Sequence, residues 1–175
     1  MCIRDRSDGT LGRADAPYSG PVALDGNLTE SLLAQIASSP LFRAADLRVA
    51  PASPGKVKRL NALQDHPTAT FYVNLTEAAR LCGRSFDDSA TAAQALCARG
   101  ARRVVVTNGG AATADATADQ VVTALPPQVA ARRFTGAGDT FMASHIAAEV
   151  AGADRQTALN QAVQTAARYV SGDPQ

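Results

Sequence analysis

Apolar residues recur every three to four positions in several segments of the chain, as they do along one face of a helix. Leucine and isoleucine have this spacing over residues 28–36, where Asn27 is the predicted N-cap. Similar spacing, together with capping and closing residues, predicts further helices over residues 54–64 after Ser53, 76–82 before Gly83, from Asp87 or Asp88 to Gly100, 140–151 and 154–170.

Short runs of β-branched and other apolar residues lie between these segments and predict strands. They cover residues 47–50, 70–73 and 102–107, and the three consecutive valines of the last run indicate a strand buried on both faces. Residues 111–125 predict a hairpin that turns near Ala118. Strands alternating with helices predict an α/β domain with a mostly parallel sheet flanked by helices, and ligands bind such sheets at the carboxyl ends of the strands.

Composition and charge narrow the classes of function. Hydrophobic residues make up 46% of the 175 positions, which is enough for one buried core. The net charge of +1 gives no general attraction to nucleic-acid phosphates, and no apolar run approaches the roughly 18 residues of a membrane span. The three cysteines form no disulfide framework or metal pair, and His66 and His145 lack partners at metal-ligand spacing. We therefore expect a cytoplasmic domain with small-molecule ligands, and neither nucleic acid nor membrane as a partner.

The beginning of the chain carries no apolar period. Residues 1–7, MCIRDRS, lack the apolar run of a signal peptide and look like a translated sequencing artefact, with a genuine flexible tail as the alternative. The residues that follow are rich in glycine, proline, serine and aspartate. We therefore expect residues 1–21 to be unstructured or artefactual, and residues 22–175 to form the domain.

Small residues precede the predicted helix at 140–151. Gly136, Ala137 and Gly138 let the backbone approach a ligand closely, and their N–H groups at a helix N-terminus make an anion hole for phosphate oxygens. Asp139 adds a carboxylate, which fits a base that accepts a hydroxyl proton while the anion hole holds the transferred phosphoryl group. A glycine-rich N-cap with Asp139 as a partner of the helix dipole is the alternative.

Polar residues also follow two of the predicted strands. Asn74 and Glu77 lie one helical turn apart, a pair that can hold the water shell of Mg²⁺, with a capping box as the alternative. Thr107 and Gly109 follow the valine strand, where the glycine admits a nucleotide close to the backbone. A plain tight turn is the alternative there.

The order of these motifs, NxxE, TxG and then TGAGDTF, resembles the C-terminal half of the pfkB, or ribokinase-like, carbohydrate and nucleoside kinases over residues 22–170. The resemblance implies a Rossmann-like, mostly parallel sheet and the ATP- and Mg²⁺-dependent phosphorylation of a hydroxyl on a sugar or nucleoside. It implies that Asp139 is the catalytic base. It further implies an anion hole of Gly136, Ala137 and Gly138, nucleotide contacts from Thr107, Gly109 and Thr135, and magnesium and phosphate contacts from Asn74 and Glu77.

A finer resemblance concerns the acceptor. Residues 25–28, DGNL, with Pro51, Ser53 and Lys56, are similar to the pseudouridine kinase branch, which favours pseudouridine as the substrate. For the second segment, a capped basic helix with a solvated face is the alternative. A ribokinase- or fructokinase-type sugar kinase, or an inert nucleotide-binding fragment, are the alternative functions.

The chain also departs from the family pattern. Arg133 stands where the family carries an acidic residue that helps to hold a monovalent cation, so cation activation is in doubt. The family's N-terminal part, with its Gly-Gly substrate motif and small β lid, is missing. We therefore expect the chain to bind nucleotide better than it transfers a phosphoryl group, and its oligomeric state is left open.

Overall fold

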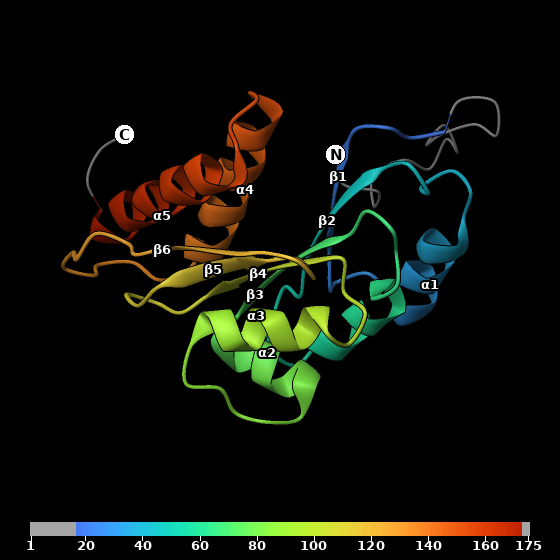
Figure 1. Ribbon diagram of the computed structural model, residues 1–175, viewed down its shortest axis with the longest axis horizontal. Coiled ribbons are helices and arrows are strands. Elements are labelled where there is room, and N and C mark those ends of the chain that lie inside the picture. Colours follow the sequence, from blue (N-terminus) through green and yellow to red (C-terminus); the bar gives the residue numbers. More distant parts are fainter. Residues whose placement is uncertain (1–16, 173–175) are drawn as a thin grey trace.

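A sheet of six strands runs through the middle of the protein (Figure 1). The computed structural model describes residues 17–172. Sheet order follows chain order: β1 (Pro21–Asp25), β2 (Asp46–Ala50), β3 (Thr70–Asn74), β4 (Arg103–Thr107), β5 (Thr113–Ala116) and β6 (Val121–Ala124). The first four strands are parallel, whereas β5 and β6 form the predicted antiparallel hairpin. The predicted α/β class with a mostly parallel sheet is confirmed.

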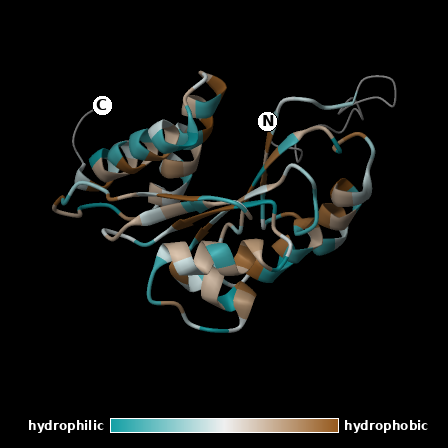
Figure 2. Ribbon diagram, viewed as in Figure 1, coloured by the Kyte–Doolittle hydropathy of each residue, from teal (hydrophilic) through white to brown (hydrophobic). Residues whose placement is uncertain are grey.

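Helices cover both faces of the sheet (Figure 1). One face carries α1 (Glu30–Ser38), the 3₁₀ helix η2 (Val57–Leu63), α2 (Leu75–Cys82) and α3 (Ser89–Cys97), and the other carries α4 (Ala137–Val150) and α5 (Arg155–Ser171). Hydrophobic residues line the strands between these layers (Figure 2). Alternation along β3 shows why both faces are apolar, since Phe71 and Val73 pack towards α1–α3 while Tyr72 packs towards α4 and α5. None of the helices between residues 17 and 172 is long and apolar enough to cross a bilayer.

Strand β1 was not expected from the sequence. Only Val22 and Leu24 of its five residues are buried core residues, so its apolar pattern is short and follows a stretch rich in glycine and proline. Parallel pairing with β2 stabilises it. Just before it, the Tyr18 ring stacks on Phe42 with centroids 5.3 Å apart. Residues 1–16, which include the MCIRDRS segment and most of the part predicted to be unstructured, lie outside the described residues.

The helix predicted over residues 54–64 is wrong in type and start. A 3₁₀ helix spans Val57–Leu63 instead, and Ser53 does not cap it. Its buried residues are Val57, Leu60 and Leu63, three positions apart. A 3₁₀ helix has three residues per turn, so this conformation places all three side chains on the core face, whereas an α-helix would rotate them apart.

The predicted start of the first helix is also corrected. Thr29, rather than Asn27, is the N-cap of α1, because its side chain accepts a hydrogen bond from the N–H of Leu32. Asn27 is held in the preceding turn, where its backbone and side-chain N–H groups donate to the carboxylate of Asp25 over 2.9 and 2.8 Å. A competing side-chain partner two residues away therefore moved the helix boundary.

A buried charge network joins the sheet to α4 and α5. We use this name for Arg48, Arg103, Asp115, Glu149 and Arg155. Glu149 binds Arg48 over 2.5 Å and Arg103 over 2.6 Å, while Asp115, which is fully buried, binds Arg103 and Arg155 over 2.5 and 2.9 Å. Each carboxylate thus pairs with two guanidinium groups, which satisfies charges that would be costly to bury alone.

His145 lies beside this network and predicts a dependence of stability on pH. The side chain is fully buried, with Nδ1 3.0 Å from the Tyr72 hydroxyl, and burial lowers its pKa from 6.5 to about 4. Between pH 6.5 and 4, His145 is protonated in the unfolded chain but neutral in the folded chain, so lowering the pH favours unfolding. The free energy of unfolding should fall by about 3 kcal/mol between pH 6.5 and 4 through this residue.

Urea unfolding across this pH range measures the effect, with His145→Gln as the test variant. Glutamine has no proton to gain, so the variant should show a slope shallower by His145's contribution, while the carboxylates of the charge network contribute equally to the slopes of both proteins. His66→Gln is the comparison variant, because burial also lowers the pKa of His66, so this variant should flatten the slope by its own contribution and leave that of His145 in place. An unchanged slope in His145→Gln would contradict the assignment.

Candidate active site

The motifs at the ends of β3 and β4 and at the start of α4 meet around one cavity. This cavity, which we call the polar cavity, has a volume of about 180 Å³. It is lined by the predicted site residues Asn74, Glu77, Thr107, Gly136, Gly138 and Asp139, and by Ala50, Pro51, Ala52, Tyr72, Val73, Phe141 and Met142. Residues far apart in the sequence are thus brought together because parallel strands end at the same edge of the sheet.

Helix α4 begins directly after the glycine that turns the chain. Gly136 is its N-cap with a φ of 89°, and the helix starts at Ala137, earlier than the predicted start at residue 140. Gly138 and Asp139 therefore belong to the first turn, where backbone N–H groups have no intrahelical acceptor. The N–H of Ala137 donates to the carbonyl of Phe134 over 3.2 Å, so it is already engaged within the turn.

Asp139 is exposed at the polar cavity. Its carboxylate makes no hydrogen bond or ion pair with any of residues 17–172. A carboxylate without a protein partner, in the first turn of a helix that also offers N–H donors, can accept a proton from a bound ligand.

The capping box expected as an alternative for Asn74 and Glu77 is present. The Asn74 side chain accepts from the Glu77 N–H, and Glu77 Oε2 accepts from the Asn74 N–H, both over 2.9 Å. Burial raises the pKa of Glu77, which is 7% exposed, although the bonds from Asn74 oppose the shift. Capping does not remove either residue from the site, since both line the polar cavity.

Asn74 and Glu77 can supply only part of the ligand set of a magnesium ion. Within the described part of the chain, no three His, Cys, Asp or Glu side chains lie close enough to hold a metal ion by themselves. Amide and carboxylate oxygens suit this ion, which keeps several waters and takes its remaining ligands from substrate phosphates. The two residues therefore fit a magnesium ion that arrives with a phosphate ligand.

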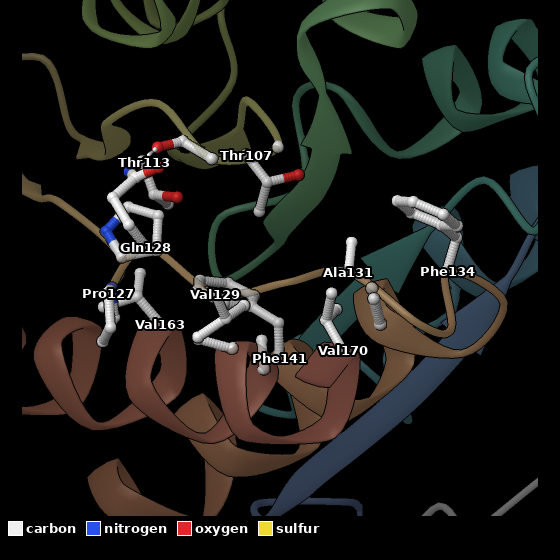
Figure 3. Close-up of a pocket in the computed structure, with 17 residues that line it drawn as sticks. Thr107, Thr113, Pro127, Gln128, Val129, Ala131, Phe134, Phe141, Val163 and Val170 are labelled. Carbon is white, nitrogen blue, oxygen red and sulfur yellow. Dashed lines mark hydrogen bonds between the residues drawn. The ribbon is translucent and has the colours of Figure 1, made fainter. Parts of the chain in front are cut away.

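Figure 3 shows a second, apolar cavity, which has a volume of about 250 Å³. The two share Thr107, Gly138 and Phe141. Predicted residue Gly109 lines the apolar cavity with a φ of 55°, close to Gln128, whose side chain donates to the Gly110 carbonyl over 3.1 Å. Its other walls are Gly110, Thr113, Pro126, Pro127, Val129, Ala131, Phe134, Ala137, Val163, Ala166, Ala167 and Val170.

Most of this apolar lining was missed by the sequence reasoning. Val163, Ala166 and Val170 have helical spacing and form one face of α5, but a stripe of this kind is typical of any buried helix. Pro126 and Pro127, which follow β6, were interpreted only as the end of the hairpin. An apolar slot beside a helix N-terminus is suited to a flat, uncharged ring that carries phosphate groups.

The sequence matches the pfkB family of carbohydrate kinases over residues 15–172. The chain belongs to this family. A carbohydrate kinase from Agrobacterium tumefaciens is 26% identical with a TM-score of 0.70, and the match covers 91% of this chain and 51% of that one. A comparison with curated protein sequences found no match.

Two further solved structures have the same fold. Phosphofructokinase-2 from Escherichia coli, solved with potassium, has a TM-score of 0.76 at 18% identity, covering 91% of this chain and 53% of that one. The ribokinase of Arabidopsis thaliana, solved with ribose and ATP, has a TM-score of 0.73 at 24% identity, covering 88% and 50%. The chain therefore spans about half the length of the structures it matches.

In this pfkB-family chain the loops after β1 and β2 lie against each other. The Gly26 N–H donates to the Ala50 carbonyl over 2.9 Å, and a Cβ on Gly26 would lie 2.3 Å from the Pro51 carbonyl oxygen, so only glycine fits. Lys56 Nζ donates to Asn27 Oδ1 over 2.5 Å. Residues 25–28 and the segment from Pro51 to Lys56 are thus neighbours, and Pro51 lines the polar cavity.

Proposed function

We propose that this chain carries the nucleotide and phosphoryl-transfer site of a kinase that uses ATP to phosphorylate a hydroxyl on a sugar or nucleoside. The observation that carries the proposal is the juxtaposition of the Asp139 carboxylate and the N-terminus of α4 at one cavity, next to an apolar slot. Membership of a carbohydrate kinase family supports it, as does the ribokinase of similar fold that was solved with ribose and ATP.

Each part of the site has a separate task in this reaction. The apolar cavity takes the adenine ring, and the first-turn N–H groups of α4 hold phosphate oxygens. Asp139 accepts the proton of the acceptor hydroxyl as its oxygen attacks the γ-phosphorus, and ADP leaves. Asn74 and Glu77 hold the water shell of magnesium, which when bound neutralises charge on the phosphates.

Pseudouridine is the acceptor that we propose within this class. The contact between Lys56 and Asn27, and the bonds from Asn27 to Asp25, support it because they assemble polar groups from both resembling segments. A sugar such as ribose or fructose is the second candidate, favoured by the relatives of similar fold. Cys82 and Cys97 are free thiols, which suits a cytoplasmic enzyme.

Binding of Mg-ATP to the chain, measured by calorimetry, tests the nucleotide site. Val129 is 40% exposed and lines the apolar cavity. Val129→Asp should weaken ATP binding by about tenfold or more. When ATP binds, the new carboxylate would lose its water against the adenine ring and would repel the negatively charged phosphates. Val150→Asp is the matched control, since this valine is 66% exposed at the far end of α4. Equal affinities in the two variants would speak against an adenine slot here.

A further inference from the structure

The last turn of α5 is bonded to the segment that leads into α4. The Tyr169 hydroxyl donates to the Thr135 carbonyl over 2.7 Å. The backbone N–H groups of Arg132 and Arg133 both donate to the Val170 carbonyl, over 2.8 and 3.1 Å. Three hydrogen bonds therefore tie one end of α5 to the residues that precede the turn at Gly136.

The Tyr169 side chain also fills the space over that turn. Gly136 has a φ of 89°, which favours glycine, and a Cβ there would lie 2.6 Å from the Tyr169 hydroxyl oxygen and displace it. The Arg133 guanidinium lies over the face of the Tyr169 ring, 4.8 Å from the ring centre. This cation–π contact restrains the ring that carries the hydroxyl.

The bond to Thr135 sets the direction of the next N–H group. The Thr135 carbonyl and the Gly136 N–H belong to one planar trans peptide unit and point in opposite directions. Because Tyr169 holds the carbonyl, the Gly136 N–H points away from Tyr169, and Gly136 is a wall of the polar cavity. The bond thus sets the orientation of a donor at the start of the turn formed by Gly136, Ala137 and Gly138, which we call the anion-binding turn.

We propose that Tyr169 is a positioning residue that fixes the anion-binding turn in its ligand-ready conformation, and that Arg133 holds the Tyr169 ring in place. The inference rests on the proposed function, because it assigns the turn to the phosphates of ATP. A turn fixed before the ligand arrives spends no binding free energy on its own ordering. Neither residue needs to touch the nucleotide to have this effect.

Calorimetry with ATP and with adenosine separates positioning from general stability. Tyr169→Phe keeps the ring and removes one hydrogen bond, so we expect ATP and ADP affinity to fall about five- to tenfold. Adenosine has no phosphate groups and should bind Tyr169→Phe as it binds the unsubstituted chain. Tyr18→Phe is the matched control, since its ring stacks on Phe42 before β1, and it should bind all three ligands normally.

Arg133→Ala and Arg132→Ala form a second matched pair. Both remove one positive charge from adjacent exposed positions, but only Arg133 stacks on Tyr169. We expect Arg133→Ala to lose several-fold more ATP affinity than Arg132→Ala. Equal losses would show that charge alone acts, and would overturn the role of Arg133.

A measurement without nucleotide tests the turn directly. The ¹⁵N relaxation of the Gly136 and Gly138 amides should show greater mobility in Tyr169→Phe than in the unsubstituted chain. Unchanged mobility, unchanged ATP affinity, or equal losses for ATP and adenosine would each overturn the inference and leave the proposed function standing. If the unsubstituted chain binds no ATP, both fall together.

Discussion

Asp139→Asn is expected to reduce phosphoryl transfer by about 10²–10⁴-fold, the range typical for the loss of a general base. Asparagine keeps the shape of the side chain and its place in the first turn of α4, but it cannot accept the hydroxyl proton. ATP binding should be equal or tighter in this variant, because a negative charge next to the phosphates is removed. Loss of turnover without loss of nucleotide affinity is therefore the expected signature.

The measurement is ADP release with pseudouridine, uridine, ribose and fructose as acceptors, alongside ATP calorimetry. Asp119→Asn is the matched control, since Asp119 is an exposed carboxylate in the turn between β5 and β6. Transfer that is unchanged in Asp139→Asn would remove Asp139 from the mechanism. Faster release with pseudouridine than with uridine and the sugars is expected, and a preference for ribose or fructose would replace the acceptor we propose.

Asp115→Asn is expected to lower the free energy of unfolding by about 3–5 kcal/mol, because it removes one partner from a buried ion-pair network. Asp115 is fully buried and accepts hydrogen bonds from Arg103 and Arg155, so the variant leaves two guanidinium groups short of a counter-charge. Thermal unfolding should begin roughly 6–20 °C lower, at about 2–4 °C per kcal/mol for a chain of this size. Asp119→Asn should unfold as the unsubstituted chain does.

The pH dependence of the same carboxylate gives an independent readout. Burial acts to raise the pKa of Asp115, but the bonds from Arg103 and Arg155 outweigh it and hold the pKa below the usual 3.8. The stabilisation is therefore complete above pH 3.8 and is lost as the pH falls through the lower, folded-state pKa. Asp115→Asn should lack this acid transition. A variant that unfolds at the same temperature, with the same acid transition, would show that the network contributes nothing.

Local patterns in the sequence predicted the central strands of the sheet and the end of α2. The valines of β4 predicted a strand buried on both faces, because their side chains must leave water on both sides of the sheet, and the β-branched and aromatic residues of β3 predicted a second strand. Gly83 closes α2 in the left-handed conformation, as its position predicted. Strand β1 was not predicted, because its two buried side chains make too short an apolar pattern. It is stabilised by pairing with β2, which the local sequence does not reveal.

Some parts of the candidate site could be predicted from the sequence and others could not. Asn74, Glu77, Thr107 and the segment from Thr135 to Asp139 were identified from residue type and order, because their chemistry is local to short motifs. The apolar cavity, the contact of Tyr169 with Thr135 and the charge network were not identified, because each joins residues whose separation in the chain carries no signal.

By itself, the sequence determined the α/β class and the family and predicted the candidate site residues, since these depend on apolar period and on short motifs. Only the tertiary structure decided that the polar cavity adjoins an apolar slot, that Tyr169 covers the turn at Gly136, and that Asp115 and Glu149 both pair with Arg103. The physical reason is that burial and hydrogen bonding between distant segments depend on how the layers pack, and packing is a property of the whole chain.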